Sequence, residues 1–363
     1  MHAVILAGGS GTRLRPLTYA RRKELMPVLN RPLLEYRIEN LREHGVVDIV
    51  IACSASAREL RDHFKDGSAL GVNLRYSFEQ RPLGSGRAVK EAARSVGAEG
   101  ETLVVCNGDI LTNIDLTEML AAHWKAHATM SMSLAAVDDP WNFGVVAVDD
   151  ELAITAFVEK PPQGQEPSNL INAGTWLWEP EVLERIPDDE SAVRDQFAER
   201  ELFPGLIADG LRLQGFEEDL WVDVGAPDRY LRANALLLER LAAQAETSPV
   251  TEGESLIAGD ATFSGLVFVS DDCVISRGAT IKGPTVIGPH CQVGAGATVE
   301  GCVLWERVNI GPDASVSRSI LADGVRIGRE ARVSRGVIAS GASVPDGARL
   351  ADGATLAPNE TAQ

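Results

Sequence analysis

The feature that most constrains the fold is a six-residue repeat in the C-terminal third of the chain. Between residues 257 and 299 a large aliphatic or aromatic residue recurs at every sixth position, and a small or β-branched residue follows each one four positions later. The large residues are Ile257, Phe263, Val269, Ile275, Ile281, Ile287, Val293 and Val299. A period of six fits no helix. It suits short strands and tight turns, stacked so that one apolar side chain per repeat enters a shared core.

The repeat continues to residue 356 with slips of one residue that are themselves regular. It resumes at Leu304, Leu321 and Ile338, which are spaced 17 residues apart. The pattern resembles the hexapeptide-repeat left-handed parallel β-helix. Its handedness comes from that resemblance, because the general crossover rule favours the opposite hand. We predict this β-helix over residues 251–357, followed by a tail of residues 358–363.

The N-terminal part alternates short apolar runs with amphipathic stretches. The apolar runs that read as strands are residues 3–7, 48–52 and 103–106. Residues 32–44 instead place apolar side chains at helical spacing. This alternation predicts an α/β, Rossmann-like domain with a mostly parallel sheet. A helical pattern over residues 226–246 reads as its connector, so we place the domain at residues 1–246.

Composition excludes several classes of partner. The chain has 363 residues, with 34 Lys and Arg against 52 Asp and Glu, a formal net charge of −18. Binding to nucleic acid or to an anionic membrane needs a basic surface, so neither is expected. No apolar run approaches the ~18 residues of a membrane span. The five cysteines form no C-x-x-C pair, which indicates free thiols in a reducing, cytoplasmic compartment.

The loop after residue 7 carries the strongest chemical signal. Residues 6–18 read LAGGSGTRLRPLT, with three glycines within four positions. Such a loop lets backbone N–H groups converge on an anion. It is neither a Walker loop nor a dinucleotide G-x-G-x-x-G, because Leu14 stands at the last glycine position. Cations crowd behind it in an otherwise acidic chain: Arg13, Arg15, Arg21, Arg22, Lys23, Arg31 and Arg37. The combination predicts a polyphosphate site.

Together with KELMPV at residues 23–28, this loop is similar to the signature of the sugar-1-phosphate nucleotidyltransferases. Further motifs of that family occur in family order: PLGSG at 82–86, NGD at 107–109, FGV at 143–145, EKP at 159–161, NAG at 172–174 and WVDVG at 221–225. The added β-helix matches the longer members, notably the mannose-1-phosphate guanylyltransferases.

The resemblance implies that an NTP and a sugar-1-phosphate form an NDP-sugar and pyrophosphate. It implies catalytic roles for Arg13, Lys23 and Asp109, and Mg²⁺ ligands at Asp109 and Asp223. The implied nucleotide-binding residues are Leu6, Ala7, Gly8, Gly9, Gly11, Thr12, Arg13, Glu79, Pro82 and Gly84. The implied sugar-phosphate-binding residues are Gly144, Glu159, Lys160 and Asn172.

The base is indicated by Glu79, five residues before Gly84. A carboxylate only accepts hydrogen bonds and suits the paired donors of guanine, so GTP is favoured. The neighbouring Gln80 and the unusual pair Gly86-Arg87 leave the base open.

Glucose-1-phosphate thymidylyl-, uridylyl- or adenylyltransferases therefore remain alternatives, as does a non-catalytic regulatory subunit of the same architecture. The phosphate and metal residues are all present, which favours the enzyme. The flat faces of the β-helix suit homo-oligomer contacts.

Overall fold

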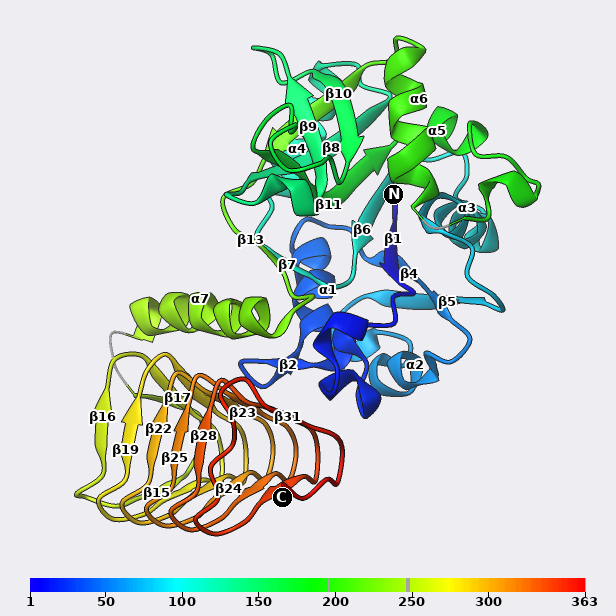
Figure 1. Cartoon of the computed structure of the whole chain (residues 1–363). Coiled ribbons are helices and arrows are strands. Elements are labelled where there is room, and N and C mark those ends of the chain that lie inside the picture. Colours follow the sequence, from blue (N-terminus) through cyan, green and yellow to red (C-terminus); the bar gives the residue numbers. More distant parts are fainter. Residues whose placement is uncertain (195, 246–248, 363) are drawn as a thin grey trace. The chain divides into compact units, whose positions relative to one another are not determined.

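The computed structural model describes residues 1–194, 196–245 and 249–362 (Figure 1). The chain forms two compact units. The first contains Met1–Gly9 and Leu34–Trp221, and the second contains Ser10–Leu33 and Val222–Gln363. The predicted domain boundary at residue 246 and the last residue of the predicted tail, 363, lie outside the described residues. Among the described residues, no helix has both the length and the apolar character needed to span a membrane.

The first unit is built on a nine-stranded sheet. Its strands are β1 (His2–Ala7), β4 (Asp48–Ser54), β5 (Asn73–Glu79), β6 (Leu103–Asn107), β8 (Met130–Ala136), β9 (Gly144–Val148), β10 (Ile154–Glu159), β11 (Leu170–Trp178) and β12 (Leu213–Glu217). The main order is β10-β9-β11-β6-β1-β4-β5, and β8 joins β11 to β12. Strands β6, β1, β4 and β5 run parallel, whereas β11 is antiparallel to β6. Their carboxyl ends bring Ala7, Glu79 and Asn107 to one edge of the sheet. The short strands β7 (Ile110–Thr112) and β13 (Trp221–Asp223) follow β6 and β12 in the chain.

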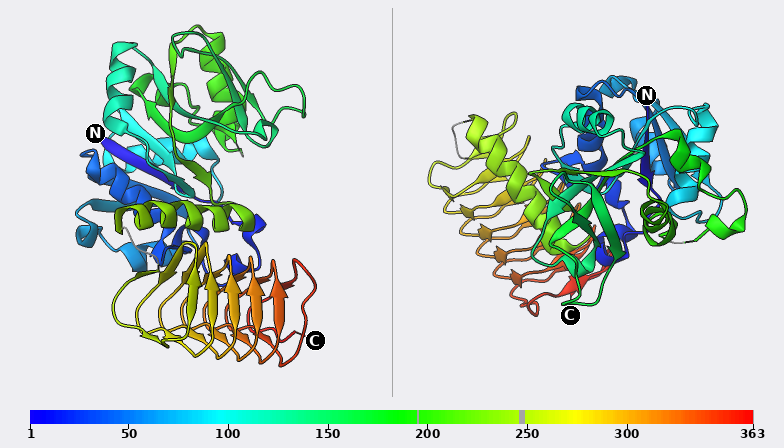
Figure 2. Two further views of the ribbon diagram at one scale, coloured as in Figure 1. Left: turned by 90° about the vertical axis from the view of Figure 1, so that its left-hand side faces the viewer. Right: turned by 90° about the horizontal axis from the view of Figure 1, so that it is seen from above.

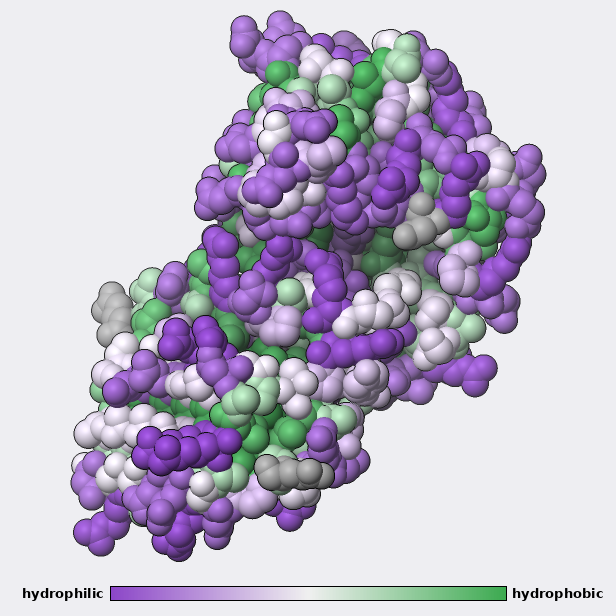
Figure 3. Space-filling view, viewed as in Figure 1, coloured by the Kyte–Doolittle hydropathy of each residue, from purple (hydrophilic) through white to green (hydrophobic). Residues whose placement is uncertain are grey.

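The α-helices among the described residues that accompany these strands are α1 (Leu33–Glu43), α2 (Arg58–Phe64), α3 (Ser85–Val96), α4 (Leu116–Lys125), α5 (Pro180–Glu184) and α6 (Phe203–Ala208). Helix α3 packs against β1, β4 and β5, while α4 packs against β8 and β12, and α6 packs against β10. The predicted mostly parallel α/β class is confirmed. Hydrophilic residues dominate the visible surface of this unit (Figure 3).

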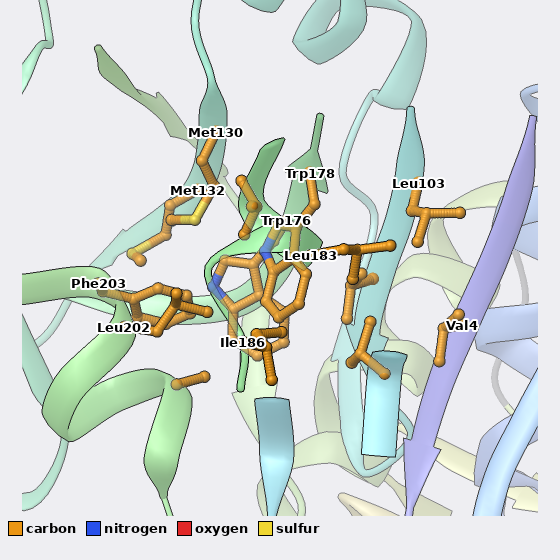
Figure 4. Close-up of a cluster of buried hydrophobic side chains, with 14 of the residues drawn as sticks. Val4, Leu103, Met130, Met132, Trp176, Trp178, Leu183, Ile186, Leu202 and Phe203 are labelled. Atoms are coloured by element: carbon orange, nitrogen blue, oxygen red, sulfur yellow. The ribbon is translucent and has the colours of Figure 1, made fainter. Parts of the chain in front are cut away.

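Aromatic side chains fill the core beneath α5 and α6 (Figure 4). Trp176 and Trp178 lie two positions apart on β11, so both point to the same face of the sheet. Phe203 meets the Trp178 ring edge-on at 6.2 Å between centroids and the Trp176 ring at 5.9 Å. Met130 and Met132 of β8 complete this cluster. All five side chains are buried, and such packing stabilises the sheet whose edge carries the site motifs.

The second unit contains a β-helix of three parallel sheets (Figure 2). One sheet comprises β14 (Val250–Thr251), β17 (Val267–Val269), β20 (Thr285–Ile287), β23 (Val303–Leu304), β26 (Ile320–Leu321), β29 (Val337–Ile338) and β31 (Thr355–Leu356). The next comprises β15 (Leu256–Ile257), β18 (Val274–Ile275), β21 (Gln292–Val293), β24 (Asn309–Ile310), β27 (Arg326–Ile327) and β30 (Ser343–Val344). The third comprises β16 (Thr262–Ser264), β19 (Thr280–Lys282), β22 (Thr298–Glu300), β25 (Ser315–Ser317) and β28 (Arg332–Ser334).

The repeat read from the sequence accounts for this architecture. Three hexads make one coil, since Ile257 pairs with Ile275, 18 residues on. After the first slip the offset becomes 17, as in the pairing of Leu304 with Leu321. The β-helix class is therefore confirmed. It also continues past residue 357, where the sequence placed a tail: Ala362 is buried and its N–H donates to the Ser343 carbonyl at 2.9 Å.

The rest of the second unit is a helix and an irregular segment. Helix α7 (Pro227–Ala245) precedes the β-helix. Segment 10–33 holds three 3₁₀ helices, η1 (Thr12–Leu14), η2 (Leu17–Tyr19) and η3 (Lys23–Leu25), and the two-residue strands β2 (Pro27–Val28) and β3 (Arg31–Pro32). The cations behind the glycine-rich loop from Arg13 to Arg31 thus belong to the β-helix unit, whereas Arg37 lies on α1 of the first unit and is buried.

Candidate functional site

The glycine-rich loop begins where β1 ends and continues into η1. Gly11 has a φ of +60°, a conformation that side chains other than glycine rarely adopt. A Cβ on Gly11 would lie 2.9 Å from Thr18 Cγ2 and 3.6 Å from Lys23 Cβ. The Thr18 hydroxyl donates to the Gly11 carbonyl at 2.9 Å, which holds the turn. The sequence thus folds so that Lys23 lies beside the loop.

Arg13 is paired with Asp223 within the second unit. The Arg13 Nη2 atom lies 3.5 Å from Asp223 Oδ2, and Arg229 Nη1 donates to the same oxygen at 2.9 Å. The Asp223 side chain is 11% exposed, whereas that of Arg13 is 64% exposed. A Cβ on Gly225 would lie 2.6 Å from both Arg13 Nη2 and Asp223 Oδ1. The last glycine of the WVDVG motif therefore makes room for this ion pair. Sequence reasoning missed Arg229, which lies in no motif.

The predicted base-binding loop is held by Glu79 at the end of β5. The Leu83 N–H donates to Glu79 Oε2 at 3.1 Å. The other carboxyl oxygen, Oε1, lies 3.7 Å from where a Cβ on Gly8 would stand. Burial raises the pKa of Glu79, and the bond from Leu83 opposes that rise. The structure thus brings Glu79 together with Gly8 of the glycine-rich loop.

Gly84 joins this loop to α3 in a conformation that only glycine suits. Its φ is +79°, and a Cβ would lie 1.9 Å from the Arg194 carbonyl oxygen. The Ser85 hydroxyl then donates to Glu199 at 2.6 Å. Pro82, the first residue of the motif, is exposed.

A cavity of about 440 Å³ opens beside the base loop, with Glu79 in its wall. Ion pairs line it: Arg81 pairs with Glu190, and Arg87 Nη1 donates to Asp188 at 3.0 Å. Arg87 also pairs with Glu91 at 2.6 Å, and its side chain is 14% exposed. Arg87, the cation of the unusual pair Gly86-Arg87, therefore pairs with carboxylates of its own chain.

The predicted sugar-phosphate residues meet where β10 and β9 pair. Glu159 lies opposite Gly144 in the register. A Cβ on Gly144 would lie 2.9 Å from Glu159 Oε2. Lys160 Nζ lies 3.3 Å from Glu159 Oε1, with the lysine half exposed and the glutamate 7% exposed. Gln196 Nε2 donates to the same Oε1 at 2.8 Å. Gln196 falls in no motif, so the sequence offered no signal for it.

The NGD and NAG motifs also meet within the first unit. Strand β11 has a register shift between Asn172 and Trp176, typical of a β-bulge. Within it Asn172 Oδ1 accepts the Gly174 N–H at 3.0 Å, and a Cβ on Gly174 would lie 2.7 Å from Asn107 Nδ2. The Gly108 N–H donates to the Leu6 carbonyl at 3.0 Å, which ties the NGD loop to the end of β1. Asp109 follows directly.

The residues predicted to bind the nucleotide, the sugar phosphate or the metal thus occur in both compact units. The second unit holds Gly11, Thr12, Arg13, Lys23 and Asp223. The first unit holds Leu6, Ala7, Gly8, Gly9, Glu79, Pro82, Gly84, Asp109, Gly144, Glu159, Lys160 and Asn172. Joint action of Arg13 and Lys23 with Asp109 stays a prediction. Among the described residues, no three His, Cys, Asp or Glu side chains form a group that could hold a metal on their own.

Two family models match the chain. One, described as nucleotidyl transferase, matches residues 2–240, and the other, the LbH domain of the EIF2B epsilon subunit, matches residues 254–361.

Curated relatives and a solved structure are also similar. The mannose-1-phosphate guanylyltransferase of Mycobacterium tuberculosis is 34% identical over 280 residues, covering 76% of this chain and 75% of the relative. The UTP–glucose-1-phosphate uridylyltransferase of a Synechocystis species is 34% identical over 252 residues, covering 66% and 64%. The crystal structure of a putative glucose-1-phosphate thymidylyltransferase from Bacillus anthracis superposes with a TM-score of 0.59 at 25% identity, covering 65% of this chain and 94% of that one.

Proposed function

Because the chain belongs to the nucleotidyl transferase family, we propose that it joins an NTP to a sugar-1-phosphate and releases pyrophosphate, with GTP and mannose-1-phosphate as substrates. Glu79 carries the choice of base. It stands in the wall of a cavity at the end of β5 as a carboxylate, which only accepts hydrogen bonds. Guanine offers N1–H and amino donors to such a group. The similarity to a mannose-1-phosphate guanylyltransferase supports the same base and sugar.

The reaction depends more on stabilising the negative charges of its substrates and leaving group than on proton transfer. A phosphate oxygen of the sugar phosphate attacks the α-phosphorus in line, and the bond to the departing pyrophosphate breaks. The nucleophile is already anionic, so no strong general base is required. The protein must hold two anions together and stabilise the charge that develops on the leaving group.

The cations of segment 10–33 would bind the triphosphate of the NTP. Arg13, beside the glycine-rich loop, would bind the β- and γ-phosphates through its planar fork. Lys23, which packs against Gly11, would act as a point charge on the α-phosphate during its transfer. The backbone N–H groups of Gly8, Gly9 and Gly11 would contribute further donors.

The pair of Glu159 and Lys160 would serve the sugar phosphate. Lys160 is half exposed and would bind the phosphate group, whereas Glu159 would accept sugar hydroxyls. Gln196 and Lys160 share Oε1 of Glu159, so Oε2, which faces Gly144, would be the oxygen that contacts the sugar. Asn172 would shape the same pocket.

Mg²⁺ is the proposed cofactor, with Asp109 and Asp223 as its protein ligands. Carboxylate oxygens together with phosphate oxygens and water form the donor set that Mg²⁺ prefers. Asp223 can supply such an oxygen at the end of β13, where its side chain lies beside Arg13 and its Oδ1 atom lies 2.6 Å from where a Cβ on Gly225 would stand. When bound, the ion would neutralise phosphate charge.

A matrix of pyrophosphate-release assays tests the proposal. Four NTPs are combined with mannose-, glucose- and N-acetylglucosamine-1-phosphate, and GTP with mannose-1-phosphate should give the highest kcat/KM. A preference for UTP with glucose-1-phosphate would instead match the Synechocystis relative. Glu79→Gln should lower the ratio of GTP to UTP and dTTP turnover. The control is Glu59→Gln, since Glu59 is exposed on α2 and does not line the cavity. An unchanged ranking of the four NTPs in Glu79→Gln would remove this residue from base recognition.

We also propose that the β-helix forms homo-oligomer contacts through its first two coils. Outward positions on the sheet that starts with β15 begin as the apolar Leu256 and Val274 and then become Gln292, Asn309 and Arg326. Leu256 is 74% exposed. Light scattering should show a smaller mass for Leu256→Asp than for the control Gln292→Asp. Equal masses would refute this interface.

A reducing, cytoplasmic location is proposed from the cysteines. All five are buried and none is in a disulfide, and three of them lie inside the β-helix. Burial raises the pKa of the Cys106 and Cys273 thiols, which keeps them protonated and unreactive. Titration of the native protein with a thiol reagent should therefore be slow, and full reactivity should appear only on unfolding.

A further inference from the structure

Segment 10–33 makes specific contacts with the β-helix. Arg21 Nη2 donates to Asp323 Oδ2 at 2.9 Å. The same guanidinium lies over the Trp305 ring, 5.1 Å from its centroid. The other carboxyl oxygen of Asp323 accepts the Glu306 N–H at 3.3 Å. Arg21 therefore meets a carboxylate that is already fixed between two successive coils.

A second chain of hydrogen bonds leads from the β-helix through α7 to the same segment. Trp305 Nε1 donates to the Tyr230 hydroxyl at 2.8 Å, and that hydroxyl donates to the Pro27 carbonyl. Both ring systems are buried, at 1% and 0% exposure. The Leu29 N–H also donates to Asn234 Oδ1 at 3.0 Å. Buried polar groups are costly to leave without partners, so each link holds the next.

These two anchors flank Lys23. Arg21 lies two residues before it and Pro27 four residues after it, so only five residues connect the two anchored positions. The segment has no long helix or strand of its own, only three-residue 3₁₀ helices and two-residue strands. Local hydrogen bonds of this kind are too few to hold a loop in one conformation. Its position therefore depends on its partners.

We infer that the β-helix is a structural part of the triphosphate site, in which Asp323, Trp305 and Tyr230 position segment 10–33 and with it Arg13 and Lys23. The roles of Arg13 and Lys23 rest on the proposed function, whereas the anchoring of the segment does not. The three anchors touch no substrate and are positioning residues. The β-helix thereby has a role in each protomer, besides any contact between protomers.

Kinetics of charge-swapped variants test the link between Arg21 and Asp323. Arg21→Asp and Asp323→Arg should each lower kcat/KM for the NTP by roughly 10- to 100-fold, because small displacements of binding groups have effects of that size. The double variant should recover most of the loss, since it restores an ion pair of opposite polarity. Asp352→Arg is the matched control, because Asp352 pairs with Arg335 inside the β-helix. It should leave kcat/KM unchanged. Equal kcat/KM in wild type and both single variants would overturn the inference.

Hydrogen exchange tests the anchoring without reference to activity. In the full-length protein, peptides that cover residues 10–33 should exchange faster in Asp323→Asn and in the milder Tyr230→Phe than in wild type. Asp352→Asn should leave them unchanged. Unchanged exchange in both anchor variants would refute the positioning role whatever the activity. If the anchor variants exchange faster than wild type but the wild-type protein releases no pyrophosphate, the proposed function is refuted and the anchoring stands.

Discussion

Glu218 should make the first unit less stable as the pH rises through the neutral range. Part of this residue reaches solvent, but its carboxyl oxygen Oε1 is buried. Burial raises the pKa of Glu218 from its ordinary value of 4.5 to about 7, against the opposing effects of the Thr112 hydroxyl, Arg37 and Ser133. The folded protein therefore retains this proton at pH values where the unfolded chain has lost it.

The size and sign of the effect follow from that difference. A group whose folded-state pKa is raised binds more protons in the folded state, so the free energy of unfolding falls as pH rises from about 4.5 to about 7. The total contribution is about 3 kcal/mol, since each pKa unit corresponds to about 1.4 kcal/mol. Below pH 4.5 the penalty is absent, and above about pH 7 it is complete. Glu218→Gln removes the titration, so the variant should gain about 3 kcal/mol over wild type between pH 4.5 and pH 7.5.

Urea unfolding followed by tryptophan fluorescence measures this gain. Five tryptophans, at positions 124, 141, 176, 178 and 221, lie in the first unit and one, Trp305, in the second, so the signal reports mainly the first unit. Glu217→Gln is the matched control, because Glu217 is the adjacent residue and its side chain is exposed at the end of β12. If Glu218→Gln and wild type show parallel pH profiles of the unfolding free energy between pH 4.5 and 7.5, the reasoning from burial is wrong.

Three further substitutions follow from the site. Asp109→Asn should lower kcat by a few orders of magnitude at saturating Mg²⁺, since a charge partner at the transition state is worth ~3–5 kcal/mol; near-normal turnover would exclude it as a metal ligand. Gly84→Ala should destabilise the first unit by roughly 3 kcal/mol in urea unfolding, because its Cβ would lie 1.9 Å from the Arg194 carbonyl; equal midpoints would contradict that contact. Gln196→Leu should raise KM for the sugar-1-phosphate by roughly tenfold, with KM for the NTP unchanged, because Glu159 loses a hydrogen bond worth about 1 kcal/mol or more. Parallel changes in both KM values would indicate a general structural defect.

The sequence predicts the β-helix in detail because its period is set by local geometry. Each coil repeats the same strand and turn, so every inward residue meets the same requirement. Even the one-residue slips appear in the structure, as a 17-residue offset between the paired residues Leu304 and Leu321. The glycines of the site are predictable for a similar reason. Gly11 and Gly84 adopt positive φ values that a Gly-rich motif anticipates.

Residues that act through long-range contacts could not be predicted in this way. Gln196 reaches Glu159 across 37 positions, and Arg21 reaches Asp323 across 302. The sequence shows Arg21 only as one of the cations behind the glycine-rich loop and does not single out Gln196, because a hydrogen bond between distant segments leaves no spacing in the sequence. The assignment of segment 10–33 to the β-helix unit cannot be seen in the sequence for the same reason, since its chain neighbours on both sides, β1 and α1, lie in the first unit.

The cations assigned to substrate phosphates are held by carboxylates of the protein itself. Arg13 shares Asp223 with Arg229, and Lys160 pairs with Glu159. Like charges gathered for polyphosphate binding would otherwise repel one another, and nearby carboxylates offset that repulsion. Because Arg13 and Lys160 are exposed while their carboxylate partners are largely buried, the proposed phosphate contacts would require the cations to move and the acids to stay in place. In the proposed function, Arg13 and Lys160 would therefore offer positive charge to phosphates although each has a carboxylate partner in an acidic chain.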